Sequence, residues 1–406
     1  MPDLFRDAPL DLTSISQNQL DIAEKKRSNP LPWHGQFSPQ LAELLIREFS
    51  TAGATVFDPF VGSGTVLHEA ARTGRPAVGV ELNPAAVKLA RVYELMGLSP
   101  SNRSECLAEV ERAVFALCGH GPLFGADAGS DAELQQKLLE RLRDCTDPWA
   151  ARLWTALIVL SDFESGRFSA EFVLQRWRVL ADVIRMLPVS PVPVEVLHAD
   201  ARATGLDEDS IDLVVTSPPY INVFNYHQRF RKSVEALEWD VLKIARSEIG
   251  ANRKHRGNRF LTVVQYCLDM AQVVAELQRI CAPGARIILV VGRESNVRGV
   301  PFYNGALLAE VAGQFLGQGL ALRQERKFLN RFGTTIVEDI LHFDVPIEPA
   351  ISSLDMSVIR EVPADALREA LANAGPDVVT DIEEALARIE DVAPSPILPS
   401  TAFTTG

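Results

Sequence analysis

Cysteine is scarce in this chain: 406 residues include five, and no two of them have the short spacing of a metal-binding pair. This scarcity excludes a disulfide-dense scaffold and a cysteine-based metal site. We expect reduced, mostly buried thiols, no metal, and a cytoplasmic protein. The five residues are Cys106, Cys118, Cys145, Cys267 and Cys281.

Long apolar runs and a positive net charge are also missing. No segment approaches the roughly 18 consecutive apolar residues of a membrane-spanning helix, so we expect neither a membrane span nor a signal peptide. The formal net charge is −13, which argues against a generally basic surface for nucleic acid. Net charge describes only the average field, however, and leaves room for a local basic groove.

The sequence does contain short apolar runs that alternate with helical patterns. The runs 54–57 and 77–80 predict buried strands, and the glycine turn and helix between them predict a βαβ unit with parallel strands. Five further strands are expected, and the last two should form an antiparallel hairpin around Arg331-Phe332-Gly333. We therefore predict an α/β fold with a mostly parallel seven-stranded sheet and an antiparallel edge hairpin. The additional strands are 192–197, 211–215, 285–291, 320–327 and 334–343.

Helical patterns separate these strands. Ser38 as a cap and Pro39 at the first helical position introduce a helix over Gln40–Phe49, and other helices are expected at 66–72, 85–95 and 263–280. Between residues 100 and 190 only helix-like segments occur, including 132–143 and 150–160, so we predict a helical insertion in the sheet domain. Two amphipathic helices near 365–373 and 380–389 belong to an acidic C-terminal segment that we expect to be peripheral.

These patterns predict the following domain organisation. Residues 1–30 form an N-terminal arm, 31–100 and 191–345 form a discontinuous catalytic domain, 101–190 form the helical insertion, and 346–406 form an acidic tail. The insertion is a candidate recognition region, because it interrupts the sheet domain between its two motifs.

The first motif follows the first predicted strand and reads Asp58-Pro59-Phe60-Val61-Gly62-Ser63-Gly64-Thr65. A glycine turn after a parallel strand brings backbone N–H groups and a helix N-terminus close to a ligand. Glu81 ends the second strand and could accept hydrogen bonds from both ribose hydroxyls. Asp200 follows the next strand and could accept from an adenine amino group, and Asp58 could hold a cationic amino group. The turn lacks the third glycine of a dinucleotide site, so adenosine joined to an amino acid fits better.

The second motif, Thr216-Ser217-Pro218-Pro219-Tyr220, follows the fourth strand. An exocyclic amine on a base is a poor nucleophile because its lone pair is delocalised into the ring. Ser217 Oγ and the Pro218 carbonyl could accept its hydrogens, and Pro219 would stiffen the turn. Tyr220 could stack on a base rotated out of the duplex. We predict Ser217, Pro218, Pro219 and Tyr220 as the catalytic group.

The two motifs together resemble the S-adenosylmethionine-dependent amino-methyltransferases of DNA, which modify cytosine N4 or adenine N6. The resemblance runs from about Trp33 to Phe343 apart from the insertion, and includes Phe37-Ser38-Pro39. It implies a Rossmann-like class I methyltransferase fold with S-adenosyl-L-methionine as cofactor. The cofactor residues that we expect are Phe37, Asp58, Pro59, Phe60, Gly62, Ser63, Gly64, Thr65, Glu81, Leu82, Asp200 and Ala201.

A basic stretch is the exception in this acidic chain. Between residues 227 and 259 nine Lys or Arg face four Asp or Glu. Cations beside a base pocket would neutralise phosphates and position a strand. We therefore predict DNA as the partner, with a cognate restriction endonuclease as a further one. The expected nucleic-acid contacts are Arg229, Arg253, Lys254, Arg256 and Arg259.

Several alternatives stay open. Carbon-5 methylation of cytosine is excluded because no cysteine follows a proline as that chemistry would require. Serine at the first position of the second motif favours cytosine N4 over adenine N6. Enzymes that methylate RNA bases use similar Pro-Pro-Tyr clamps, and a protein glutamine methyltransferase would also need a clamp for a planar amide. A binding module without activity would have no cofactor affinity, and each motif taken alone could be an ordinary turn.

Overall fold

The computed structural model describes residues 5, 8–118, 130–221, 226–250, 255, 257–317, 319–330, 332–347 and 355–398. Its main sheet has seven strands in the order β3-β2-β1-β4-β5-β9-β8. The first five in that order pair in parallel, and β9 joins β5 and β8 in antiparallel register. The predicted α/β class, parallel sheet and antiparallel edge hairpin are therefore confirmed. The strands are β1 (Val56–Asp58), β2 (Ala77–Glu81), β3 (Val194–His198), β4 (Ile211–Thr216), β5 (Cys281–Gly292), β8 (Leu322–Leu329) and β9 (Thr335–Asp344).

Alternating side chains of the central strands enter two different cores. On β5, Ile287, Leu289 and Val291 join one apolar cluster, whereas Ile288 and Val290 join another. Successive side chains of a strand point to opposite faces, so this alternation means that both faces of the sheet are covered. Buried apolar residues in continuous runs, such as 287–291, are the sequence signal of such a strand.

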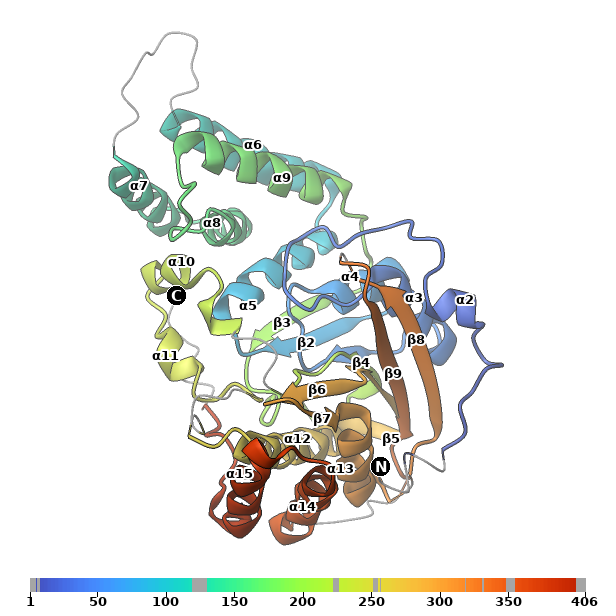
Figure 1. Cartoon of the computed structure of the whole chain (residues 1–406). Helices are drawn as coiled ribbons and strands as arrows, with labels where there is room; N and C mark the ends of the chain where they lie inside the picture. The colour runs from blue at the N-terminus through green and yellow to red at the C-terminus, as the bar shows by residue number, and fades with distance from the viewer. Residues whose placement is uncertain are drawn as a thin grey trace.

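Helices cover the two faces of the sheet. The helices α3 and α4 belong to the cluster that contains Ile288, and α12 and α13 belong to the cluster that contains Ile287. Figure 1 shows the sheet between these groups. The helix bounds are α2 (Gln17–Leu20), α3 (Pro39–Phe49), α4 (Thr65–Arg72), α5 (Pro84–Ala90), α10 (Arg231–Ala236), α11 (Val241–Ile244), α12 (Leu261–Ile280) and α13 (Asn304–Leu316), with 3-10 turns η1 (Arg91–Gly97) and η2 (Tyr226–Gln228).

Four of the helices between β2 and β3 form a layer of their own beside the fifth, α5 (Figure 1). They share an apolar cluster that includes Trp154 and Trp177, both buried. Their aromatic residues therefore form packing contacts within this layer. The helices are α6 (Pro100–Leu117), α7 (Asp131–Arg143), α8 (Pro148–Leu160) and α9 (Ala170–Met186).

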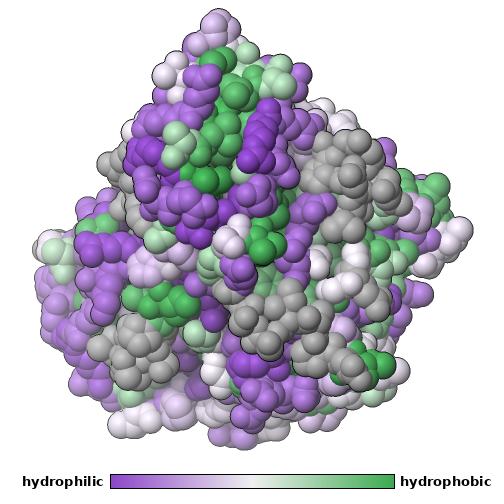
Figure 2. Space-filling model, turned by 90° about the horizontal axis from the view of Figure 1, so that it is seen from below, coloured by the Kyte–Doolittle hydropathy of each residue, from purple (hydrophilic) through white to green (hydrophobic). Residues whose placement is uncertain are grey.

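The C-terminal segment is not peripheral, so our expectation for it was wrong. Ile359, Leu367 and Ile382 are buried in the same cluster as α12 and α13. The sequence was misleading because the abundant acidic residues occupy the outer faces of these helices. Figure 2 views the molecule from the side where they lie, and hydrophilic residues cover most of that face. The helices are α14 (Met356–Ala372) and α15 (Pro376–Ala387), followed by η3 (Ile389–Asp391).

Two strands were not predicted. β6 (Glu294–Val297) and β7 (Val300–Tyr303) form a separate antiparallel hairpin directly after β5. The hairpin buries the side chains of Val297 and Phe302 in the core. Its turn is formed by Arg298 and Gly299, which both have positive φ. None of the helices in the described ranges is both long and apolar enough to cross a bilayer.

Candidate active site

A cavity opens at the carboxyl ends of the parallel strands, where ligands bind in open α/β sheets. β1 ends at Asp58, β2 ends at Glu81, and Ser217 directly follows β4. Segments that are far apart in sequence thus meet in one site. The cavity is lined by Trp33, His34, Gly35, Gln36, Phe37, Asp58, Pro59, Phe60, Val61, Gly62, Ser63, Thr65, Glu81, Leu82, Asn83, Asp200, Ala201, Ser217, Pro219, Ser247, Glu248 and Ile249.

Glu81 is positioned by the backbone of the two loops beside it. The Gly62 N–H donates to Oε2 at 2.8 Å, and the Asn83 N–H donates to Oε1 at 2.8 Å. Burial raises the pKa of Glu81 to about 7, and the nearby carboxylates of Asp58 and Glu248 act in the same direction. Each oxygen keeps a second lone pair, so the carboxylate can accept from two vicinal hydroxyls.

Asp58 is buried at the end of β1. Its Oδ1 accepts from Thr216 Oγ1 at 2.6 Å and from the Phe60 N–H at 2.9 Å. Burial raises the pKa of Asp58 to about 6, although both hydrogen bonds oppose the shift. A cationic partner in the cavity would stabilise the charged form of this carboxylate.

The glycine loop approaches its neighbours so closely that side chains would not fit. Gly62 and Gly64 both have positive φ, and a Cβ on Gly64 would lie 2.6 Å from the Tyr93 ring. The segment before α3 lies against this loop: Gln36 donates to Ser63 Oγ at 2.7 Å, and Thr65 donates to Asn29 at 2.7 Å. Phe37 lines the cavity from the same segment.

Asp200 lines the cavity as predicted, but its carboxylate also belongs to an internal ion pair. Arg202 donates to Oδ1 through Nε at 2.8 Å and to Oδ2 through Nη2 at 2.6 Å. The same guanidinium reaches Asp269 at 3.2 Å and the Ser395 carbonyl at 2.7 Å. Asp200 is thus tied to α12 and to the C-terminal segment.

The proline motif places two of its four predicted residues, Ser217 and Pro219, in the cavity wall. Tyr220 lies behind them, with its hydroxyl 3.3 Å from Ser217 Oγ and its ring against Gly292. Burial raises the pKa of Tyr220 to about 12, so the phenol stays protonated at neutral pH. Pro218 is buried and does not line the cavity, and neither does Gly64 of the glycine loop.

Two of the five predicted nucleic-acid contacts lie within the described residues. Arg229 lies over two rings, with Cζ 4.9 Å from the Phe230 centroid and 5.6 Å from the Trp33 centroid. Arg259 is exposed just before α12. The other three predicted contacts, Arg253, Lys254 and Arg256, lie outside the described residues.

Sequence reasoning missed one wall of the cavity, formed by Ser247, Glu248 and Ile249. His227 Nδ1 lies 2.8 Å from Glu248 Oε2, and the Ser247 carbonyl accepts from Arg202 at 3.1 Å. This segment follows α11 and has no strand, glycine turn or cap that marks it as part of a site. The sequence analysis also missed three cavity residues just before Phe37 for the same reason: Trp33, His34 and Gln36.

Comparison with known proteins gives this geometry a context. A family model described as DNA methylase matches residues 13–92, which include α3, the glycine loop and Glu81. Residues 13–92 of the chain are thus similar to the DNA methylase family. This confirms the predicted relationship to DNA amino-methyltransferases and S-adenosyl-L-methionine as the cofactor.

Two curated proteins are similar to this chain over short segments. The Type II methyltransferase M.MjaII of Methanocaldococcus jannaschii is 32% identical over 75 residues, or 18% of this chain and 14% of that protein. The Type II methyltransferase M.MthZI of Methanothermobacter thermautotrophicus is 36% identical over 97 residues, or 23% of this chain and 26% of that protein. The matches thus span about a quarter or less of each relative.

Solved structures match the chain only at low identity and with low TM-scores. A SAM-dependent methyltransferase from Methanosarcina mazei is 12% identical with a TM-score of 0.35, covering 75% of this chain and 98% of that one. TrmN from Thermus thermophilus is 16% identical with a TM-score of 0.30, covering 76% of this chain and 50% of that one.

Proposed function

We propose that the protein transfers a methyl group from S-adenosyl-L-methionine to an exocyclic amino group of a flipped DNA base, with cytosine N4 as the first expectation and adenine N6 as the second. One observation carries the proposal. The carboxylates of Asp58 and Glu81 lie in the same cavity as Ser217 and Pro219, although more than 130 positions separate the two motifs. A cofactor and an acceptor amine can therefore meet in one site.

The cavity fits the cofactor by the chemistry of its groups. Asp58 offers a buried carboxylate for the ammonium group, and Glu81 offers acceptors for the ribose hydroxyls. Phe37, Pro59 and Phe60 give apolar surface close to the Asp58 end. When bound, the cofactor supplies a methyl group on a sulfonium centre, which is activated for transfer without a metal or a covalent enzyme intermediate.

Ser217 and Tyr220 suit the handling of an amine. If Ser217 donates its hydrogen to the Tyr220 hydroxyl, 3.3 Å away, both lone pairs of Oγ remain available. Oγ can then accept a hydrogen from the target amine and turn its lone pair out of conjugation with the ring. The nitrogen would gain the methyl carbon as the bond from that carbon to the sulfonium sulfur breaks, which leaves S-adenosylhomocysteine. The positive charge would then lie on the nitrogen until one of its hydrogens leaves as a proton to solvent. The stacking role proposed for Tyr220 would require the base to reach the ring behind Ser217.

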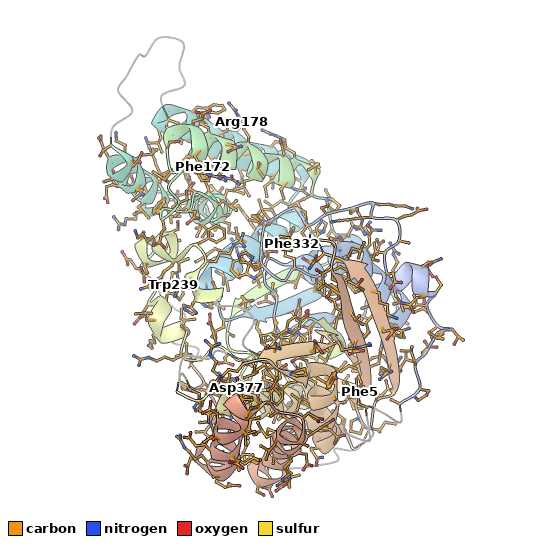
Figure 3. All side chains as sticks on the ribbon, in the orientation of Figure 1. Phe5, Phe172, Arg178, Trp239, Phe332 and Asp377 are labelled. Carbon is orange, nitrogen blue, oxygen red and sulfur yellow. The ribbon has the colours of Figure 1, made fainter. Side chains whose placement is uncertain are left out.

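Local positive charge supports nucleic acid over a protein substrate. A cavity of about 470 Å³ lies between the helical layer, α5 and the segment after α10. Its wall includes Lys88, Arg91, Arg143 and Arg152 with Glu238 as the single carboxylate, and Arg143 and Arg152 are paired with Glu238 and Glu94. Trp239 lies at its edge on the segment between α10 and α11 (Figure 3). Cations gathered beside a site in an otherwise acidic chain suit phosphates.

We propose further that residues 101–190 contribute to recognition of the target sequence, because this cavity lies between them and residues 31–100. The assignment of residues 1–30 to an arm and 346–406 to an acidic tail completes the proposed organisation. A cognate restriction endonuclease and a cytoplasmic location belong to the same proposal. The names of the two curated relatives as Type II methyltransferases support the former.

The deciding experiment offers labelled S-adenosyl-L-methionine with duplex DNA, RNA and protein in parallel, followed by mass spectrometry of the nucleosides. We expect label in DNA, on cytosine N4 or adenine N6. Label only in RNA or only in protein glutamine would refute the DNA assignment. Ser217→Ala should keep cofactor affinity and lose about 10²-fold or more in turnover, the scale for removing one group that acts in the transition state. The matched control is Ser210→Ala, at an exposed serine outside the cavity.

A further inference from the structure

The wall of the cavity that follows α11 contains two buried polar atoms without partners. Within the described residues, Ser247 Oγ and Glu248 Oε1 are both inaccessible to solvent and make no hydrogen bond. Both residues line the cavity. Buried polar atoms are nearly always paired in folded proteins, so two adjacent exceptions in residues that line one cavity indicate that a ligand supplies their partners.

The partner of Glu248 Oε1 must be a hydrogen-bond donor. Gln228 Nε2, which can only donate, lies 2.9 Å from His227 Nε2. That contact makes Nε2 the acceptor, so the proton of a neutral imidazole sits on Nδ1. Nδ1 then donates to Glu248 Oε2 at 2.8 Å. Hydrogen bonding on this side fixes Glu248 as an acceptor and leaves Oε1 for a donor from another molecule.

The position of this wall points to the adenosine end of the cofactor. Glu248 is close enough to Glu81 to raise its pKa. The Ser247 carbonyl is held by Arg202, the residue that also holds Asp200. The wall is therefore near the end of β2 and is connected to the loop after β3. Both oxygens of Asp200 already accept hydrogen bonds from Arg202. Within the described residues, Oε1 of Glu248 accepts none.

We propose that Glu248 accepts a hydrogen bond from the adenosine moiety of the cofactor and is positioned for this by His227. The donor is the adenine amino group or a ribose hydroxyl, which share the same chemistry towards a carboxylate. Ser247 Oγ, next to it, can donate to a ring nitrogen of adenine. This inference rests on the proposed cofactor and deepens it, because it assigns a second carboxylate beyond the strand ends.

The test combines protein variants with altered ligands. Calorimetry measures binding of S-adenosylhomocysteine and of two analogues, one with hydrogen in place of the adenine amino group and one with a 2′-deoxyribose. The variant Glu248→Gln keeps the shape of the side chain. Its oxygen will stay with His227 Nδ1–H, so its NH₂ group faces the adenosine donor. The matched control is Glu235→Gln, a neighbouring surface residue paired with Arg231 outside the cavity.

For wild type we expect one of the two analogues to bind about 10- to 100-fold more weakly than S-adenosylhomocysteine, the range for a hydrogen bond to a charged group. Glu248→Gln should lose a similar factor with S-adenosylhomocysteine and should no longer discriminate against that analogue. Glu235→Gln should behave as wild type. Whichever analogue shows the coupling identifies the donor.

Two outcomes would overturn the inference, and they are distinguishable. If wild type binds S-adenosylhomocysteine but Glu248→Gln discriminates against both analogues as wild type does, the cofactor assignment stands and the role of Glu248 falls. If wild type has no affinity for S-adenosylhomocysteine, the proposed function falls and takes this inference with it. Thermal unfolding of each variant shows that the comparison is made between folded proteins.

Discussion

Gly64 allows a quantitative test of how the glycine loop is packed. Its φ is +93°, and a Cβ at this position would lie 2.6 Å and 2.9 Å from two atoms of the Tyr93 ring and 3.3 Å from Ala90 Cα. Tyr93 is 1% exposed, so its ring has little room to move away. The substitution Gly64→Ala therefore meets both an unfavourable backbone conformation and a steric overlap.

The two contributions can be estimated separately. A left-handed conformation costs an ordinary residue about 1–2 kcal/mol, and inserting a carbon into a packed core costs about 1–3 kcal/mol. Together they predict that Gly64→Ala lowers the free energy of unfolding by about 2–5 kcal/mol. The entropy that alanine removes from the unfolded chain returns about 0.4–1 kcal/mol.

Gly74→Ala is the matched control. Gly74 has φ +78° and ends α4, but a Cβ there would meet nothing within 4 Å. Gly74→Ala should therefore lower the free energy of unfolding only by what the left-handed backbone conformation costs an alanine. Urea denaturation measures the free energy of unfolding of both variants. Gly74→Ala should be more stable than Gly64→Ala by about 1–3 kcal/mol. Equal destabilisation would refute the idea that Tyr93 limits the loop, and folded Gly64→Ala should also bind S-adenosylhomocysteine more weakly.

Three further predictions concern charge. Because burial raises the pKa of Asp58 to about 6, affinity for S-adenosylhomocysteine should fall as pH drops through 6 and Asp58 loses its charge. 5′-Methylthioadenosine, which lacks the amino-acid part, should not show that step in calorimetry, and a shared step would contradict the assignment of Asp58 to the ammonium group. Arg202→Met should cost about 3–5 kcal/mol in urea denaturation, because it leaves buried carboxylates without their cation. Arg368→Ala, which removes only an exposed ion pair, should leave the denaturation midpoint almost unchanged. A triple alanine variant of the basic stretch should bind duplex DNA more weakly and reduce the salt slope by about 0.9 for each phosphate that is no longer neutralised; unchanged affinity at low salt would contradict it. The three substitutions are Arg253→Ala, Lys254→Ala and Arg256→Ala.

The sheet could be predicted from the sequence because its signals are local. The runs 77–80, 211–215 and 285–291 are apolar enough to be buried on both sides, and each agrees with a strand within a few residues. Parallel order followed from one βαβ unit. The β6–β7 hairpin was missed because each strand has only four residues and neither shows a strand pattern. Glu294–Val297 has a single apolar residue, and Val300–Tyr303 contains a proline.

Helix starts were predicted better than helix ends. Pro39 opens α3 at the expected residue, although Ser38 makes no side-chain capping hydrogen bond. The helix expected over 85–95 ends at Ala90 and continues as a 3-10 turn. α14 begins well before the expected 365 and contains Pro363, which local rules place at a helix start and not inside one. Packing against α12 and α13 overrides that preference.

The residues of the candidate site also differ in whether a local sequence signal identifies them. Asp58, Glu81 and Ser217 could be found from sequence, because each stands at the end of a strand and strand ends of a parallel sheet converge. Glu248 could not, because its place depends on a chain of tertiary contacts. Arg202 holds the Ser247 carbonyl and, through Asp269 and Ser395, connects this wall to α12 and the C-terminal segment.

These contacts give the C-terminal segment a structural role next to the cavity. The carbonyls of Ser395 and Pro396 both accept from the Arg202 guanidinium, and Ser395 also donates to Asp269 at 2.6 Å and 2.7 Å. Arg202 thus binds two carboxylates and three carbonyls in a site without solvent, where each missing partner would leave charge uncompensated. The last described residues of the chain therefore complete the support of Asp200 and Ser247 on the adenosine side of the cavity. Removing them should weaken cofactor binding through the shape of that wall, even though none of them lines the cavity.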